Sequence, residues 1–187
     1  KIIINPTDVT ITTREHVEYD KKHVSELQEN TSGEILGTIV QVFDIKFFEV
    51  CPQCNKRARL TGEVFMCDVH GAVTPVYNYV VSIYVDDGTG NVRVTLWKAQ
   101  TQKLLKLTDA EIDAIRLQPE LFEKYKTDLL GVQAKVLGRA KNNITGRLEF
   151  TADLVYTDLD PAQELKELDH AKEVTLKTNK YDGNMPP

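Results

Sequence analysis

Three cysteines and one histidine are spaced as the ligands of a metal ion. Cys51, Cys54, Cys67 and His70 form the pattern C-x2-C-x12-C-x2-H. Two ligands separated by two residues can reach one ion from a tight turn, and the second pair would arrive from a facing hairpin. Because tetrahedral zinc takes four nitrogen or sulfur ligands at about 2.0–2.3 Å, the set predicts one structural Zn²⁺ ion. The alternative is that these are three ordinary cysteines.

The predicted zinc site is closed to catalysis. Four protein ligands leave no coordination position for a water molecule or a substrate. A zinc deaminase would carry a Glu beside its His ligand and a Pro-Cys-x-x-Cys pair. Here Gly71 follows His70 and Val50 precedes Cys51. The sequence also contains no Ser/His/Asp, P-loop or GxGxxG arrangement. We therefore expect a binding protein and no enzymatic activity.

The charge of the chain changes sign along its length. The net charge is −5, yet residues 51–106 hold 7 Lys and Arg against 4 Asp and Glu. Since binding depends on the local field, this positive block keeps nucleic acid among the candidate partners. No stretch approaches the roughly 18 apolar residues of a membrane span, so no membrane partner is expected. The odd number of cysteines, three, disfavours a disulfide-stapled secreted protein and favours a reducing intracellular compartment.

Strands are predicted on both sides of the cysteine segment. Residues 34–50, rich in β-branched and aromatic side chains, predict one long strand that runs into Cys51. Four further strands are predicted: 77–85, 91–98, 132–140 and 147–156. The turn 86–90 joins the first two of these. Between the third and fourth strands, Thr108 and Glu111 predict a capping box, and Pro119 predicts the first turn of a second helix.

This order predicts a mainly β fold, the five-stranded Greek-key barrel called an OB-fold, with a zinc-ribbon insertion after strand 1 and a helical segment between strands 3 and 4. The barrel is assigned to residues 21–157 and the zinc insertion to 51–70. Residues 1–20 predict a linker or the end of an upstream domain. A C-terminal helix with a thin apolar stripe is predicted over 158–175, and a flexible tail over 176–187.

Binding of a single nucleic-acid strand requires aromatic faces for stacking and cations along the backbone path. Alternation along strand 91–98 places Trp97 and Arg93 on one face, opposite a set of apolar residues: Val92, Val94 and Leu96. Trp97 is expected to face solvent, and the alternative is that it fills the barrel.

Further cations lie on loops that flank an OB-fold groove, although isolated cations usually serve only solubility. They flank the last hairpin or lie within the zinc insertion: Arg139, Lys141 and Arg147, and Lys56, Arg57 and Arg59. Five other aromatic residues are ambiguous, with at least half expected in the core: Phe43, Phe47, Phe48, Tyr77 and Tyr79.

Several of these motifs together resemble a known family. They are the long strand ending in Cys51-Pro-Gln-Cys54, the Cys67-x-x-His70 pair, Tyr77-Asn-Tyr79, and the strand Val94-Thr95-Leu96-Trp97. The chain, over roughly residues 21–174, is similar to the C-terminal DNA-binding domain of the large subunit of replication protein A, the archaeal and eukaryotic single-stranded-DNA-binding protein. His70 stands where many members have Cys, which points to an archaeal-type protein.

The resemblance implies a non-catalytic, chromosome-associated subunit that coats single-stranded DNA in replication, repair and recombination, in the cytoplasm of an archaeon or the nucleus of a eukaryote. Trp97 matches an aromatic that stacks on a base, and three cations lie near positions that contact the strand: Arg139, Lys141 and Arg147. The C-terminal helix, with Leu165 and Leu168 in its stripe, would pair with the two smaller OB-fold subunits of a heterotrimer.

Two alternatives to this assignment remain open. The C-terminal helix can instead be an ordinary amphipathic helix that packs on its own barrel. The domain as a whole can act mainly as an assembly scaffold for the heterotrimer, with little DNA binding of its own. The net charge and the acidic helix favour the scaffold.

Overall fold

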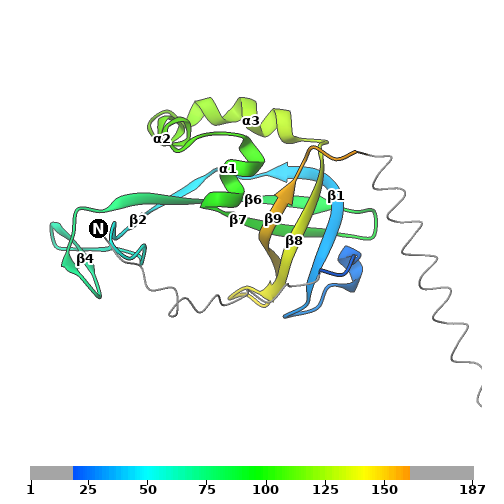
Figure 1. The fold of residues 1–187 in the computed structure, drawn as a ribbon, viewed down its shortest axis with the longest axis horizontal. Coiled ribbons are helices and arrows are strands. Elements are labelled where there is room, and N and C mark those ends of the chain that lie inside the picture. The colour runs from blue at the N-terminus through cyan, green and yellow to red at the C-terminus, as the bar shows by residue number, and fades with distance from the viewer. Residues whose placement is uncertain (1–18, 161–187) are drawn as a thin grey trace, which may run out of the picture.

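The fold is described over residues 19–160 of a computed structural model (Figure 1). The strands are β1 (Ser32–Val42), β2 (Lys46–Val50), β3 (Arg59–Thr61), β4 (Val64–Cys67), β5 (Gly71–Ala72), β6 (Val76–Asp86), β7 (Asn91–Trp97), β8 (Gln133–Asn142) and β9 (Leu148–Tyr156). The helices are α1 (Lys98–Leu105), α2 (Asp109–Leu117) and α3 (Phe122–Leu129), with 3₁₀ turns η1 (Val24–Glu26) and η2 (Pro119–Leu121).

Five of the strands pair edge to edge in a closed ring. β1 pairs with β8, β8 with β9, β9 with β7, β7 with β6, and β6 again with β1. All of these pairs are antiparallel except β7–β9, which is parallel. The helices come between β7 and β8, and α2 and α3 lie together above the strands in Figure 1. The prediction of a mainly β, OB-fold-like domain with a few helices is confirmed.

The core lies inside the ring, because alternate side chains of each strand point inward. On β7 the buried residues are the predicted set: Val92, Val94 and Leu96. Helices α2 and α3 add Ile112, Ile115 and Phe122 to the same core. The capping box at the start of α2 is present: Glu111 N–H donates to Thr108 Oγ1 at 3.4 Å, and Thr108 N–H donates to the Glu111 carboxylate at 2.8 Å. Pro119 begins the short turn η2, and α3 starts only at Phe122.

The prediction of one long strand over 34–50 is wrong. The chain forms β1 and β2, separated by residues 43–45. β1 pairs with β8 up to Thr38 and with β6 from Thr38 onward, and the pairing with β6 contains a register shift between Ile39 and Gln41. β2 then continues along β6 as an edge strand. A strand that closes a ring must bend from one neighbour to the other, and the irregularity provides that bend.

A separate three-stranded sheet, in the order β3-β4-β5, occupies most of the segment between β2 and β6. Figure 1 shows it at the far end of β2 and β6, away from the ring. The predicted insertion is therefore a small module at the end of a two-stranded extension formed by β2 and β6. Among the helices of residues 19–160, none has both the length and the apolar character needed to cross a bilayer.

Candidate functional site

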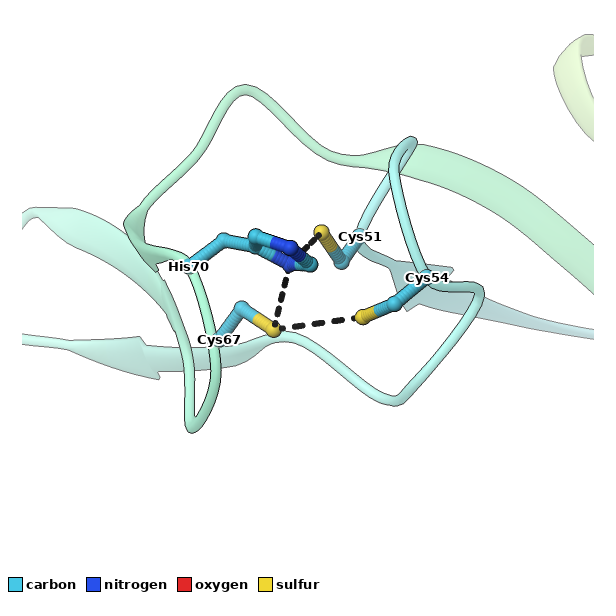
Figure 2. A group of neighbouring side chains, drawn as sticks. All are labelled: Cys51, Cys54, Cys67 and His70. Atoms are coloured by element: carbon cyan, nitrogen blue, oxygen red, sulfur yellow. Dashed lines mark hydrogen bonds between the residues drawn. The ribbon is translucent and has the colours of Figure 1, made fainter.

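The four predicted metal ligands converge on one point in the small module (Figure 2). Cys51 and Cys54 come from the loop after β2, Cys67 ends β4, and His70 lies in the turn before β5. Cys51 Sγ lies 3.4 Å from His70 Nδ1, Cys67 Sγ lies 3.8 Å from the same nitrogen, and Cys54 Sγ lies 3.6 Å from Cys67 Sγ.

These distances fit one tetrahedral ion. Ligands 2.3 Å (sulfur) and 2.0–2.1 Å (nitrogen) from a tetrahedral centre are separated by about 3.6–3.8 Å. The ligand atoms of all four residues lie within 4.8 Å of one another. The cluster can therefore hold a metal ion through three sulfurs and Nδ1 of the imidazole, with every tetrahedral position filled by the protein.

Backbone hydrogen bonds shape each half of this cluster. In the first half, Asn55 N–H donates to the Cys51 carbonyl and Cys51 N–H donates to the Lys56 carbonyl, both at 2.9 Å, with Asn55 at φ +56°. In the second half, Val69 N–H donates to Cys67 Sγ at 3.5 Å. This N–H, with that of His70, lowers the pKa of the Cys67 thiol to about 6. The thiolate, which is the form that binds a metal, is therefore favoured at neutral pH.

Trp97 lies on the outer surface of the ring, and the alternative that it fills the interior is wrong. The residue is 48% exposed, whereas the residues that point to the other face of β7 are buried: Val92, Val94 and Leu96. Arg93 shares the outer face, as the alternation predicts, but the fold holds it in place. Its guanidinium lies 4.8 Å from the centre of the Phe43 ring and donates to Ser82 Oγ at 3.3 Å.

Cross-strand register places three of the predicted cations on this same face. Arg93 of β7 is paired with Glu149 of β9, which is paired with Lys141 of β8. In the neighbouring row, Thr95 of β7 is paired with Thr151 of β9, which is paired with Arg139 of β8. Because adjacent strands lie about 4.8 Å apart, each row spans roughly 10 Å of backbone. We call the outer face of β6, β7, β9 and β8 the groove face.

The chain matches a known family over the segment that builds the metal cluster and Trp97. Residues 34–128 match the family described as replication factor-A C terminal domain. The chain belongs to this family. The resemblance predicted from the residues is therefore confirmed.

Individual relatives agree with this assignment. Replication factor A of Methanothermobacter thermautotrophicus is 25% identical over 133 residues, which are 67% of this chain and 17% of that relative. The chain thus spans less than a fifth of this relative, whose archaeal source fits the archaeal-type ligand pattern.

Two solved structures share the fold. A chain of a replication protein A heterotrimer bound to ssDNA superposes with a TM-score of 0.61 and 22% identity, over 76% of this chain and 36% of that one. A chain of yeast RPA bound to ssDNA has a TM-score of 0.58 and 18% identity, over 82% and 90% of the two chains. At these identities the likeness concerns the fold.

In this replication factor-A C-terminal domain, Phe48 connects the metal module to Trp97. The Phe48 ring meets the Trp97 ring edge to face, with centroids 6.1 Å apart and an interplanar angle of 89°. Arg57, from the loop that follows the first two cysteines, lies 5.5 Å from the centre of the Phe48 ring. Ala58 N–H donates to the Glu49 carbonyl at 3.0 Å, which lays this loop back along β2. Sequence reasoning left both Phe47 and Phe48 ambiguous. In the structure Phe47 packs against the core, and Phe48 packs against Trp97.

The remaining predicted residues are distributed as follows. Lys56 and Arg59 are exposed on the metal module, and Arg147 is exposed beside the turn between β8 and β9. The expectation that at least half of the ambiguous aromatics are buried is wrong, since Tyr79 alone is buried. The reason is that β2 is an edge strand that leaves the ring, so it has little core to face. Leu165 and Leu168 lie outside the described residues, and their role in subunit association stays a prediction.

Proposed function

We propose that this chain binds single-stranded DNA across its groove face, as the C-terminal DNA-binding domain of a replication protein A-like large subunit. The proposal places it in DNA replication, repair and recombination, associated with the chromosome, in a non-catalytic role. Both structural relatives are described as bound to ssDNA, which supports this choice of ligand.

The observation that carries the proposal is the exposed Trp97 braced by Phe48. Its indole lies on the same outer face as Arg139 and Lys141, so this face combines an aromatic ring with cations, as single-strand binding requires. The edge-to-face contact with Phe48 restrains the indole while leaving 48% of the residue exposed. Bases of any sequence can stack on such a ring, with a contribution of about 1–3 kcal/mol per base.

Cations on the same face supply the electrostatic part of binding. Arg139 and Lys141 are exposed on β8, within two strands of β7. The phosphate backbone is attracted to this local positive charge even though the chain as a whole has a net charge of −5. Glu149 lies between Arg93 and Lys141 and reduces the local positive potential. Because the attraction of phosphates to the exposed cations is electrostatic, we expect binding to weaken as salt is added.

We assign the metal as one structural Zn²⁺ ion. Three thiolates and one imidazole form a donor set that zinc prefers, and four protein ligands close the tetrahedron. When bound, the ion supplies cross-links and no chemistry. The loop that begins at the first two ligands returns along β2 and carries Arg57 to Phe48, so the module also shapes one side of the groove face.

Titration of a fluorescently labelled oligonucleotide with the full chain tests the proposal. We expect saturable binding that weakens with salt, and a loss of about 1–3 kcal/mol for Trp97→Ala. Tyr77→Ala is the matched control, because Tyr77 is a 42% exposed aromatic whose ring centre lies 4.1 Å from the Arg116 guanidinium of α2, on the face of β6 opposite to the one that Trp97 shares through its partner Val80. Absence of binding by the wild-type chain would refute the function. Equal affinity of Trp97→Ala and the wild type would remove Trp97 from the site.

Assembly with two smaller OB-fold subunits through residues 158–175 is the second candidate function, with little DNA binding required of this domain. One structural relative is described as a replication protein A heterotrimer, which favours it. The test is to measure the size of the complex that the full chain forms with candidate subunits, and to repeat it with a chain that ends at Asp160. Unchanged assembly after this truncation would argue against the scaffold.

A further inference from the structure

Trp97 is the residue at which the chain changes from a strand into a helix. It ends β7 with extended backbone (φ −77°, ψ 176°), and α1 begins at the next residue, Lys98. Trp97 is therefore the N-cap of α1, although its side chain makes no capping hydrogen bond. Because the direction of a side chain follows from the backbone conformation, the orientation of the indole depends on how firmly this junction is held.

One buried hydroxyl group closes the junction. Thr101, the fourth residue of α1, donates from Oγ1 to the Leu96 carbonyl at 2.8 Å. Leu96 belongs to β7, so the hydrogen bond closes a ring of chain that contains Trp97. A threonine within a helix commonly bonds to the carbonyl four residues earlier, inside the same helix. Here the acceptor lies five residues earlier, in the strand, and the bond joins two elements.

The burial of Thr101 indicates that this hydrogen bond does more than satisfy a polar group. Thr101 is 0% exposed, and no other aliphatic hydroxyl, amide or charged residue among residues 19–160 is buried. On the same side of α1, Leu104 and Leu105 belong to the hydrophobic core. Burying a hydroxyl group costs free energy that its hydrogen bond must offset, whereas valine has nearly the same shape without that cost. Since apolar packing alone favours valine here, the bond across the junction accounts for threonine.

The contacts around Trp97 act on two different parts of the residue. The Phe48 ring contacts the indole, whereas the hydrogen bond from Thr101 fixes the backbone from which the indole projects. A second bond holds α1 from outside, since Gln100 Nε2 donates to the Asp153 carbonyl of β9 at 2.8 Å. Figure 1 shows α1 beside β9. The indole is therefore restrained through both its ring and its backbone.

We propose that Thr101 is a positioning residue for Trp97, which holds the indole in the orientation that receives a base. This inference rests on the proposed DNA binding and concerns how that site is ordered before the strand arrives. Thr101 is buried and does not itself touch the ligand. An aromatic ring that is already ordered loses less conformational entropy when a base stacks on it, so a loosened junction weakens binding. The effect of Thr101 on affinity therefore depends on the presence of Trp97.

Titration of a labelled oligonucleotide with the full chain, together with the fluorescence of Trp97, tests the proposal. Thr101→Val keeps the shape, removes the hydrogen bond and should weaken binding about two- to tenfold, the effect of one hydrogen bond. Trp97 is the single tryptophan of the chain, so its fluorescence anisotropy reports on this indole, and we expect a lower value in Thr101→Val. Thr127→Val is the matched control, because Thr127 Oγ1 donates to the Glu123 carbonyl at 3.0 Å within α3. It should leave affinity and anisotropy unchanged.

A conservative variant separates positioning from stability. Thr101→Ser keeps the hydroxyl group and removes a buried methyl group, so it should unfold at a lower temperature than the wild type. It should nevertheless bind the oligonucleotide with nearly the wild-type affinity and show the wild-type anisotropy of Trp97. A loss of affinity in Thr101→Ser that follows its loss of stability would refute the positioning role. This comparison holds even if Thr101→Val does not fold.

The double variant Trp97→Ala/Thr101→Val decides whether Thr101 acts through Trp97. If it does, the double variant binds as weakly as Trp97→Ala and no more weakly. Additive losses would place the effect of Thr101 elsewhere in the domain and refute the proposal. Equal affinity of Thr101→Val and the wild type would also refute it, while the proposed function would stand. If the wild-type chain itself does not bind, the proposed function fails and the positioning role fails with it.

Discussion

Removing the metal ion is expected to unfold the small β3–β4–β5 module while the ring of five strands stays folded. The continuous hydrophobic core contains no residue from 51–75. Within that segment the buried residues are the ligands Cys51 and Cys67 and one alanine, Ala58. β3 is exposed along its whole length. The module therefore depends on its ligands rather than on apolar packing.

The magnitudes make the outcome clear. Burying the methyl group of Ala58 contributes about 0.8 kcal/mol. Each residue of the module costs about 1–2 kcal/mol of backbone entropy to order. A structural zinc ion contributes about 10–16 kcal/mol in isolated zinc-finger peptides at pH 7. Since apolar burial is far smaller than either of the other two contributions, the module should lose its order when the ion leaves.

Hydrogen exchange measured by mass spectrometry, with and without a chelator, checks this prediction. Amides of residues 51–75 should lose protection, whereas those of β1, β6, β7, β8 and β9 should keep it. Oligonucleotide affinity should fall in parallel, because Arg57 would no longer lie against Phe48. Cys67→Ser should reproduce the effect without chelator. Unchanged protection of 51–75 in protein shown to be metal-free would refute the reasoning, as would collapse of the whole ring.

Two further predictions concern charge. Lys141→Ala should weaken oligonucleotide binding and reduce the slope of log K against log salt by about 0.7, the value for one phosphate contact on a single strand, and an unchanged slope would exclude that contact. Asp87 accepts from Val24 N–H at 2.8 Å, and although burial raises the pKa of its carboxyl, hydrogen bonds from Val24 and Thr89 bring that pKa below its ordinary value. A lowered folded-state pKa stabilises the fold above the unfolded-state pKa, and this stability is lost as the pH falls through the folded-state value. Asp87→Ala should therefore cost about 2 kcal/mol in urea unfolding at pH 7 and at pH 5, with a difference that shrinks only below about pH 4. A constant difference down to pH 3 would contradict this account.

The parts of the site that sequence predicted are those set by short-range rules. The metal cluster follows from two ligand pairs that each span four residues, so local turns suffice to bring each pair together. The outward position of Trp97 follows from the two-residue period of a strand, and the start of α2 follows from a four-residue capping box. None of these requires knowledge of which strands are neighbours.

The parts that sequence missed depend on neighbours. The bend between β1 and β2 exists because one strand must serve two partners, and this is visible only once β8 and β6 are known to be those partners. Phe48 and Phe47 are adjacent identical residues, and only the position of β2 at the sheet edge assigns one to the surface near Trp97 and the other to the core.

The structure also ranks the cations that sequence treated alike. Arg93 is 30% exposed, held against Phe43 and Ser82, and 4.0 Å from the Glu149 carboxylate. Contact with a phosphate would require the guanidinium to give up these interactions. We therefore expect Arg93 to stabilise the sheet beneath the bound strand rather than to contact a phosphate. Lys141 is exposed on the strand at the far side of the same row. The exposed cations that can follow a DNA backbone therefore lie on β8 and beside the turn that joins it to β9.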